Sequence, residues 1–435
     1  MTFDDATQIV PNLTTTLTGP LLSLEKTFLN RQVEIETWLR KAWQVTPAPI
    51  QCSVDLRNAG FKLAPVDTNV FPAGFNNLSY DSIPLCIQAL QATFAKQFPG
   101  CEKILLIPEN HTRNIFYLEN VATLVEILNK AGYQVKVGSL IPDIESSKDI
   151  GLPSGRTLQL HQILRNNHKL YVENFMPCMI LLNNDLSDGL PEILTGLQQL
   201  IQPSLKLGWS NRTKSTHFKF YSQVASEFAN EIDIDPWLIN PLFSTVENVD
   251  FNHKPDLEII AEQAQQILQK TAETYHQYDI KSQPYVMIKA NSGTYGMGVL
   301  PITDAQQIIR LNRKERNKMA RNKGKETINS VLIQEGIPTF ETIGVNKDVA
   351  EPVVYMLGQH VVGGFYRIHK DKKENENLNS PGMHFQPLAF SQSCINPDSK
   401  KSPDANVNRF YAYGVVARLA LLAAAYELAA ITEEL

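Results

Sequence analysis

Short β-rich runs alternate with helical patterns between residues 51 and 207, and this alternation limits the folds open to the chain. The helical patterns lie near residues 82–98 and 115–131, between runs that are typical of strands. The expected strands are QCSVDL (51–56), KILLIPE (103–109), QVKVGSL (134–140), MILLNND (179–185) and LKLGW (205–209). Such alternation is typical of a mainly parallel sheet covered by helices. The sequence therefore predicts an α/β fold for this part of the chain.

The rest of the chain follows other patterns. Residues 1–46 look helical, and residues 215–278 are mostly helical with one apolar face. From Tyr285 a strand, a glycine-rich loop, a helix and a strand precede a hairpin that turns at Gly358-Gln359, and a closing helix follows. A chain of 435 residues can bury two or three cores. The predicted parts are a helical leader (1–50), an N-terminal α/β lobe (51–210), a helical connector (211–280) and α+β C-terminal lobes (281–435).

Charge and hydropathy argue against nucleic-acid and membrane partners. The formal net charge of -5 leaves no sustained basic field for nucleic acid or an anionic membrane. The one basic run, residues 310–325, lacks interleaved aromatic residues, so we interpret it as a solvated helix or a mobile flap. The most apolar stretch, residues 413–431, carries Arg418 and Glu427, which indicates a helix packed inside the protein and not a membrane span.

The cysteines and the N-terminus bear on the compartment. The cysteines are odd in number, are scattered without a CxxC pair, and indicate reduced thiols instead of a disulfide framework or a zinc site. They are Cys52, Cys86, Cys101, Cys178 and Cys394. The N-terminus begins with acids and lacks the basic-then-apolar layout of a secretory signal. We therefore expect a cytoplasmic protein.

The sharpest local motif is KANSGTYGMGV, which follows an apolar strand. Gly293, Gly296 and Gly298 let backbone amides approach an anion closely, and Lys289 faces the same ligand from the strand end. The motif is not a P-loop, because GKS or GKT is missing, and no βαβ unit with an acidic ribose ligand follows it. A flexible turn whose glycines serve only the turn is the alternative.

Polar residues follow the next predicted strands. Gln334, Glu335 and Glu341 lie at and beyond a strand end, where a hinge offers backbone groups to an adenine edge and carboxylates to a ribose. The predicted hairpin then delivers Arg367, followed by the polar loop ENENLNSPG (374–382). An arginine beside asparagines and acids can clamp a polyphosphate and hold its magnesium through oxygen ligands. A surface ion pair is the alternative for Arg367.

This arrangement resembles the ATP-grasp superfamily of carboxylate-amine ligases, in which a strand-borne lysine precedes a glycine-rich flap and an arginine precedes an Asn-Leu loop. Lys214 in RTKSTHFKFY is similar to the earlier lysine of these folds. The ten-residue spacing from Arg367 to Asn377 looks like that of bacterial glutathione synthetases. The string NLNSPGM instead looks like the magnesium motif of D-alanine-D-alanine ligases, with Asn377 in place of a glutamate, and only one of these alignments can hold.

The resemblance implies which residues hold the metal and the nucleotide. Magnesium would be held by Asn377 and Asn379, with Glu351 or Glu376 supplying negative charge. The residues expected to bind ATP are Lys214, Lys289, Gly293, Gly296, Gly298, Gln334, Glu335 and Glu341.

Polar strings at strand ends in the N-terminal lobe narrow the family. They cover residues 53–79, 107–124, 181–191 and 208–218. They look like the proteobacterial glutamate-cysteine ligase family of ATP-grasp type, which catalyses the first step of glutathione synthesis. The resemblance extends from about residue 50 to residue 430, and the first string is its most distinctive part.

The first string is dense in short hydrogen-bonding side chains, which suits a site that holds the ammonium and carboxylate ends of an amino acid. A surface loop stitched by its own Asn and Asp turns is the alternative. Arg113 follows a strand, at the carboxyl edge where α/β proteins bind ligands. The expected substrate-binding residues are Asp55, Arg57, Lys62, Asn69, Asn76, Asn77 and Arg113; Asp67 lies in the same string.

The resemblance implies a mechanism. Magnesium-ATP phosphorylates the side-chain carboxylate of glutamate, and the amine of cysteine attacks the acyl phosphate. Lys289 and Arg367 are the expected catalytic residues; with Lys214 they act on the phosphates, while the flap at 291–298 excludes water. Two alternatives stay open: a ligase for another acidic amino acid and amine, and a nucleotide-binding regulatory protein without turnover. The sequence leaves the oligomeric state open.

Overall fold

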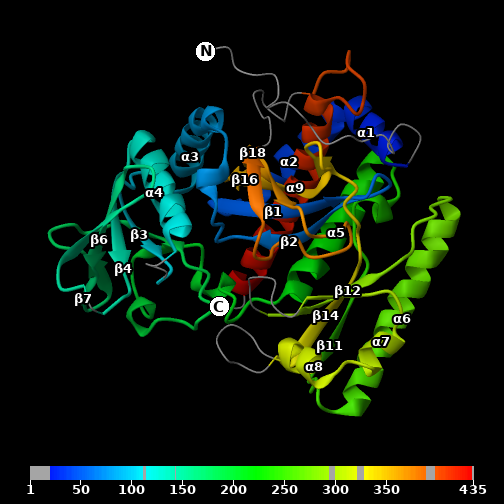
Figure 1. Cartoon of the computed structure of the whole chain (residues 1–435). Helices are drawn as coiled ribbons and strands as arrows, with labels where there is room; N and C mark the ends of the chain where they lie inside the picture. Colours follow the sequence, from blue (N-terminus) through cyan, green and yellow to red (C-terminus); the bar gives the residue numbers. More distant parts are fainter. Residues whose placement is uncertain are drawn as a thin grey trace.

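The computed structural model describes residues 20–110, 114–142, 144–292, 299–320, 328–387 and 397–433. Within these ranges the chain is a mixed α/β protein with several sheets (Figure 1). A sheet of the N-terminal half, a central antiparallel sheet and a smaller sheet of the C-terminal half follow one another across the molecule.

The sheet of the N-terminal half is mainly parallel. Its strands β10, β9, β3, β4 and β6 pair parallel, and only β5 joins β6 antiparallel. In order across the sheet they are β10 (Leu200–Gln202), β9 (Met179–Asn183), β3 (Lys103–Pro108), β4 (Gln134–Ser139), β6 (Thr157–Gln162) and β5 (Ser147–Gly151). The runs ILLIP and MILLN are fully buried, as expected for strands covered on both faces. The helices α3 (Ile83–Gln97) and α4 (Ile115–Lys130) share their core, and β7 (Leu164–Asn166) and β8 (Lys169–Tyr171) form a separate hairpin.

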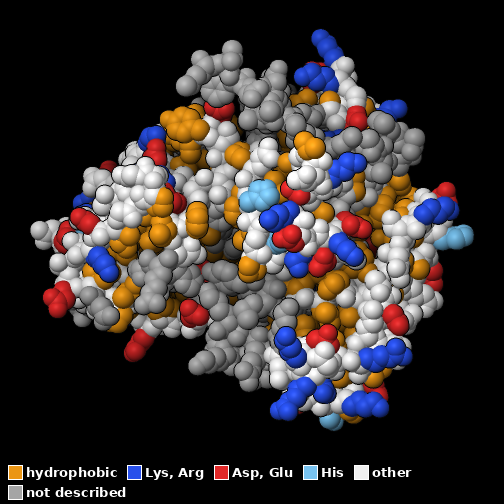
Figure 2. All heavy atoms as spheres, in the orientation of Figure 1, with side chains coloured by type: hydrophobic (Ala, Val, Ile, Leu, Met, Phe, Trp, Pro, Cys, Tyr) orange, Lys and Arg blue, Asp and Glu red, His pale blue; other side chains and the backbone are white. Residues whose placement is uncertain are grey.

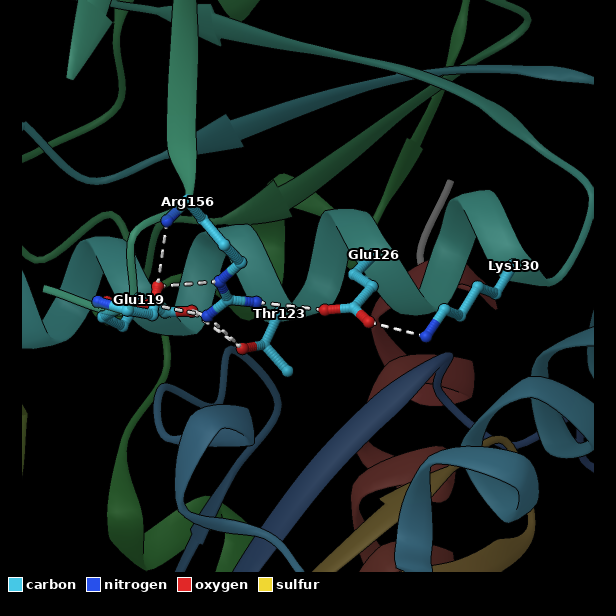
Figure 3. Close-up of polar contacts among 6 residues, drawn as sticks. Glu119, Thr123, Glu126, Lys130 and Arg156 are labelled. Atoms are coloured by element: carbon cyan, nitrogen blue, oxygen red, sulfur yellow. Dashed lines mark hydrogen bonds and ion pairs between the residues drawn. The ribbon is translucent and has the colours of Figure 1, made fainter. Parts of the chain in front are cut away.

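This lobe contains a turn where a strand was expected, and a polar network that the sequence did not indicate. The segment LKLGW is not a strand: residues Leu205–Leu207 form a 3-10 turn that the side chain of Ser204 caps, and the strand is β10. A polar network fixes the turn between β5 and β6 onto α4 (Figure 3). In it, Arg156 bonds to Glu119 at 2.5 Å, to Thr123 at 3.0 Å and to Glu126 at 3.1 Å.

Two of the cysteines form a disulfide bond, so the prediction that all five are reduced thiols is wrong for this pair. Cys101 and Cys178 precede the neighbouring parallel strands β3 and β9, which brings their Cα atoms to 5.8 Å, within bonding range. Cys52 and Cys86 are free thiols, as predicted, and both are buried. Cys394 lies outside the described residues.

The central sheet is antiparallel and contains β1, which was expected in the parallel sheet. That expectation is wrong, because β1 pairs with β16 on one side and with β2 on the other. The strands in order are β18 (His384–Pro387), β17 (His360–His369), β16 (Asp348–Leu357), β1 (Gln51–Asn58) and β2 (Leu63–Asn69), and β15 (Thr342–Ile343) pairs with β16. The predicted hairpin is confirmed as β16 and β17, which turn at Gly358 with φ +53°. A Cβ there would lie 2.0 Å from Thr93 Oγ1, so the turn requires glycine.

The third sheet runs β11, β14, β12, β13. Its strands are β11 (Phe243–Glu247), β14 (Ser330–Glu335), β12 (Val286–Ala290) and β13 (Leu300–Ile302). The segment expected to be a helical connector thus contributes a strand, because β11 pairs antiparallel with β14. Three helices accompany this sheet: α6 (Lys254–Gln277), α7 (Gln306–Ile309) and α8 (Arg313–Met319). Within the basic run, α8 is a solvated helix whose N-terminus is capped by an Asn312–Glu315 capping box. Figure 2 shows basic side chains around it.

Long helices cover the face of the central sheet that carries Val54 and Leu56. They are α1 (Pro20–Asn30), α2 (Gln32–Val45), α5 (Lys214–Ile232) and α9 (Asn406–Glu433). The apolar helix α9 is long enough to cross a membrane over Val407–Ile431, but 72% of that window is buried inside the protein. The prediction that this helix packs within the protein is confirmed: its side chains from Phe410 to Ala425 are almost all fully buried.

Candidate active site

A row of alternating charges crosses the central sheet. Glu351 on β16 pairs in register with Arg367 on β17, and the antiparallel register places Arg57 of β1 on the opposite flank of Glu351. Arg57 Nε lies 2.6 Å from Glu351 Oε2, and Arg367 Nη1 lies 2.6 Å from Glu351 Oε1. Arg367 Nη1 also donates to Asp55 Oδ2 at 2.7 Å. We call Asp55, Arg57, Glu351 and Arg367 the charged row; it unites three residues that sequence reasoning assigned to substrate and catalysis with one assigned to the metal.

Neighbouring charges set the protonation of the charged row. Burial acts to raise the pKa of Glu351, but Arg57 and Arg367 together lower it below its usual value. Burial raises the pKa of Asp55, and Glu351 adds to the rise while Arg367 opposes it. The pKa of Arg367 is raised, because Asp55 and Glu351 outweigh the effect of burial. The two acids of the row are therefore shifted in opposite directions, the pKa of Asp55 upward and that of Glu351 downward.

Two partly buried lysines lie near this row. Lys289 on β12 donates from Nζ to the carbonyl oxygen of Val66 at 2.9 Å and to Gln334 Oε1 at 2.7 Å. Lys214 begins α5, and its Nζ lies 4.2 Å from the ring centre of Trp209. Both lysines were expected to meet the nucleotide, and the structure brings them together from separate elements.

The two lysines repel each other electrostatically. Burial lowers the pKa of Lys289 to about 8; Asp67 opposes this shift, whereas Lys214 adds to it. Burial likewise lowers the pKa of Lys214 against the effect of Asp67. Two ammonium groups that act on each other in this way favour an anion between or beside them.

Gln334 adds an unsatisfied donor beside Lys289. Its side chain is 1% exposed, and its Nε2 has no hydrogen-bond partner among the described residues. A buried donor without an acceptor costs free energy, and such groups in native proteins often mark a ligand or an unseen water. Gln334 therefore offers a hydrogen bond to an acceptor atom of a ligand at this point.

A buried ion pair that sequence reasoning missed positions the start of α5. Arg212 bonds to both carboxylate oxygens of Glu427 on α9, at 2.8 and 3.0 Å, and donates to the carbonyl oxygen of Thr68 on β2 at 2.8 Å. Because Lys214 follows two residues later, this pair fixes Lys214 relative to β2. The two residues are 215 positions apart, so no local sequence pattern indicates that they pair.

The loop after β2 is held by side chains from the parallel sheet. Asn120 Oδ1 accepts from the backbone N–H groups of Gly74 and Phe75 at 2.8 and 2.9 Å, and Asn120 Nδ2 donates to Asn183 Oδ1 at 3.0 Å. Gly74 has φ +125°, and a Cβ there would lie 2.7 Å from Tyr355 Oη. Asn120 and Asn183, which sequence reasoning did not single out, therefore connect the N-terminal sheet to this loop.

The predicted asparagines of the same string make local contacts. Asn69 Oδ1 accepts from Phe71 N–H at 2.8 Å, and Asn76 Nδ2 donates to Asn77 Oδ1 at 3.5 Å. Such turns match the loop alternative stated above for these three residues. These hydrogen bonds lie within the loop itself.

Three predicted ligand-binding residues are used inside the protein. Lys62 Nζ lies 2.7 Å from Glu335 Oε2, and both side chains have no exposed surface. Glu341 is also fully buried, where it accepts from the hydroxyl of Tyr413, and its pKa is raised by burial to about 7. The structure therefore does not bring these three residues into the charged row.

The predicted metal ligands lie around an arginine. Arg57 contacts Glu351 and also donates to the carbonyl oxygens of Glu374 and Glu376, each at 2.7 Å, in the loop that carries Asn377 and Asn379. A guanidinium at this point opposes a metal ion among those residues. Asn377 Oδ1 accepts from the backbone N–H of Asn379 at 3.0 Å.

Asp55 and Asp67 offer another pair of carboxylates for a metal, and the guanidinium of Arg367 is bonded to Asp55. They lie directly opposite each other on β1 and β2, where two like charges destabilise each other unless a cation neutralises them. Magnesium that arrives with a nucleotide commonly needs only one or two carboxylates. No group of three or more His, Cys, Asp and Glu side chains in the described ranges could hold a metal by itself. The flap glycines Gly293, Gly296 and Gly298, and Arg113, lie outside the described residues.

Comparison with known proteins decides the family. A family model described as glutamate-cysteine ligase matches residues 25–428. The chain belongs to the glutamate-cysteine ligase family. It is accordingly a ligase, as the sequence resemblance predicted.

Solved structures agree with this assignment. A candidate gamma-glutamylcysteine synthetase from Methylobacillus flagellatus KT shares 51% sequence identity and a TM-score of 0.91, over 97% of this chain and 99% of that chain. D-alanyl-alanine synthetase A from Vibrio cholerae (10% identity, TM-score 0.36, 73% of this chain and 81% of that one) is too remote to support an argument. The same holds for a glutathione synthetase-like effector from Globodera pallida (8%, 0.34, 82% and 78%). No curated protein matches the chain.

Proposed function

We propose that the protein joins glutamate to cysteine at the expense of ATP, through an acyl phosphate, and so catalyses the first step of glutathione biosynthesis in the cytoplasm. The nucleotide-binding part would be of the ATP-grasp class. Family membership supports a glutamate-cysteine ligase reaction, and the geometry of the charged groups supports the use of a polyphosphate.

The observation that carries this proposal is the pair of lysines on β12 and α5. Lys289 and Lys214 converge from different elements, and their mutual repulsion contributes to a pKa of about 8 for Lys289. A triphosphate would relieve this repulsion and accept from the unpartnered Nε2 of Gln334. The protein would therefore bind ATP by neutralising its charge in a site already arranged for it.

In the proposed reaction, an oxygen of the glutamate side-chain carboxylate attacks the γ-phosphorus of ATP, and ADP leaves. The amine of cysteine, after loss of a proton, attacks the acyl carbon, and phosphate leaves. No protein nucleophile is needed. Lys289 and Lys214 would stabilise the charge on the phosphates, and Arg367 would orient the reacting groups from the charged row.

Magnesium would accompany ATP. Asp55 and Asp67 are the carboxylates that would hold it, and the ion would neutralise charge on the phosphates when bound. Arg367 bonds to Asp55 at 2.7 Å and would keep this carboxylate in place. Glu351 would act on the same site by fixing both arginines.

The experiment is ADP release by purified protein with magnesium-ATP, with glutamate and cysteine added alone and together, and mass spectrometry of the product. The proposal expects γ-glutamylcysteine, with one ADP for each dipeptide, only when both amino acids are present. A panel of other acidic amino acids and amines tests the rival substrates. ATP binding with no ADP formed from any pair would contradict the proposal and favour the regulatory alternative.

A further inference from the structure

A small polar cavity lies at the carboxyl ends of strands β3 and β9 of the parallel sheet, and none of the charged row lines it. It has a volume of about 200 Å³, less than the ~300–1,000 Å³ of pockets that hold drug-sized ligands. Its polar lining comes from residues that follow β3 and β9, and Leu140 after β4 completes one wall. The polar residues are Glu109, Asn110, Asn184, Asp185, Ser187 and Asp188. The cavity has room for one end of a small molecule and not for a nucleotide.

The position of the cavity in the sheet is one where α/β proteins bind ligands. From β3 the chain passes through α4 to β4 on one side, whereas β9, on the other side of β3, is followed by β10 still further out. The connections therefore diverge between β3 and β9. Ligands of open parallel sheets bind outside the carboxyl ends of the strands at such a point.

Asp185 gives the cavity its chemical preference. The residue is only 4% exposed, yet it lines the cavity. Its Oδ1 accepts from Ser187 N–H at 2.9 Å, and its other carboxylate oxygen has no hydrogen-bond donor among the described residues. Asp188 adds a second acid to the lining, and no lysine or arginine of the described ranges lines the cavity. A buried carboxylate facing a cavity of this charge favours a cationic group.

The cavity is connected to the lysine pair. The backbone carbonyl of Asp185 accepts from Trp209 N–H at 2.9 Å, and the ring of Trp209 lies beneath Lys214. Asp185 also acts electrostatically on Lys214, opposing the effect of burial on its pKa. A ligand anchored at Asp185 can therefore extend toward the phosphates that Lys214 would contact.

We propose that this cavity binds the α-ammonium group of the acidic amino acid, with Asp185 as its acceptor, and directs the side-chain carboxylate toward Lys214 and the γ-phosphate. The inference rests on the proposed function and assigns its substrate subsite. The amine of cysteine does not fit here, because it must lose a proton to attack, whereas Asp185 and Asp188 stabilise the ammonium form. The cavity thus separates the unreactive amine of one substrate from the reactive amine of the other.

The test compares the wild-type protein with Asp185→Asn, using glutamate and glutarate, which lacks the α-ammonium group. Asparagine keeps the acceptor for Ser187 N–H and removes the charge. We expect the KM for glutamate to rise at least about tenfold in Asp185→Asn, with the KM values for ATP, cysteine and glutarate within about twofold. Asp149→Asn, on the exposed strand β5, is the matched control and should leave all four unchanged.

Calorimetry with the wild-type protein measures the affinity of the subsite for each ligand, and it needs neither turnover nor a mutation. Glutamate should bind at least about tenfold more tightly than glutarate, and Asp185→Asn should remove the difference. An unchanged KM for glutamate in the variant, or a rise in the KM for cysteine instead, overturns the inference while the ligase function stands. If the wild-type protein forms no γ-glutamyl product, the proposed function fails, and calorimetry still decides whether the ammonium site exists.

Discussion

Lys62 and Glu335 neutralise each other in the interior, with 2.7 Å between Nζ and Oε2 and no exposed surface on either side chain. Lys62 lies between β1 and β2, and Glu335 ends β14, so the pair joins the central sheet to the third sheet. Trp237 Nε1 and Leu242 N–H also donate to the carboxylate of Glu335, at 3.0 and 2.9 Å. Both charged groups therefore have partners within the protein.

Replacing one partner of this pair should destabilise the protein. Lys62→Met leaves the Glu335 carboxylate buried without its cation, a change that typically costs about 3–5 kcal/mol. Urea unfolding measures the loss, and Lys62→Met with Glu335→Gln should recover part of it. Lys281→Met, at a lysine whose side chain is 84% exposed, is the control and should change the free energy of unfolding little. Equal stability of Lys62→Met and the wild-type protein would contradict the role of the pair.

Lys289→Met should remove a charge that acts on the phosphates. Loss of one electrostatic stabiliser commonly lowers kcat about 10²–10³-fold, and we expect an effect of this order, together with weaker ATP binding. Steady-state kinetics and calorimetry with ATP measure both. Lys270→Met on the exposed face of α6 should behave as wild type. ATP affinity unchanged in Lys289→Met would remove this lysine from the nucleotide site.

The affinity for ATP should fall as pH rises through about 8. The free-protein pKa of Lys289 is lowered to about 8, so above that pH the side chain is neutral and cannot attract phosphate. Bound phosphate raises this pKa, so binding near pH 8 should take up protons, which calorimetry in buffers of different ionisation enthalpy detects. Lys289→Arg stays charged and should flatten the pH profile between pH 7 and 9. A profile that is identical in both proteins would assign the titration to another group.

Stability should decline between about pH 5 and pH 8 because of a buried acid. Burial raises the pKa of Glu25 from 4.5 to about 8, while Arg409 opposes the shift. Between these values the folded state holds a proton that the unfolded state has released, so stability falls as pH rises and is largest at the acidic end. Thermal unfolding across this range should show a shallower slope in Glu25→Gln. Glu34→Gln, on the exposed surface of α2, should keep the wild-type slope.

The disulfide can be checked by peptide mapping without reduction. A crosslinked peptide containing Cys101 and Cys178 is expected, and it should disappear after reduction. Cys52 and Cys86 should react with thiol reagents only after unfolding, because both are buried. Recovery of Cys101 and Cys178 only as separate free thiols from protein kept oxidised would contradict the pairing.

The sequence was most informative where a local pattern decides structure. The apolar run of β3 and the hairpin turn at Gly358 were predicted correctly, because burial on both faces and a positive φ leave clear signals in the sequence. β11 was missed: its segment FSTVE is short and only partly buried, and it is a strand because β14 offers an antiparallel edge. The placement of β1 likewise depends on β16, almost 300 residues later, which no local pattern reveals.

The candidate site shows the same division. Arg367, Lys289 and Lys214 were predicted as site residues from motif spacing. In the structure Lys214 acts electrostatically on Lys289, and Arg367 bonds to Asp55, which also acts on Lys289. The contacts that hold them were not predictable, because Arg212–Glu427 and Asn120–Asn183 join residues distant in sequence. Lys62 and Glu335 were predicted to bind ligands because both are polar residues near strand ends. Their pairing with each other could not be seen from the sequence.

The central claim is that ATP phosphorylates the glutamate side-chain carboxylate in this site. The most direct test uses glutamate labelled with ¹⁸O in that carboxylate, together with ATP and cysteine, followed by mass spectrometry of the released phosphate. Our account predicts one ¹⁸O in each phosphate and one retained in the amide of each dipeptide, since one carboxylate oxygen leaves with phosphorus. Phosphate without label, or label found in AMP, would show that the carboxylate is not activated as an acyl phosphate and would contradict the account.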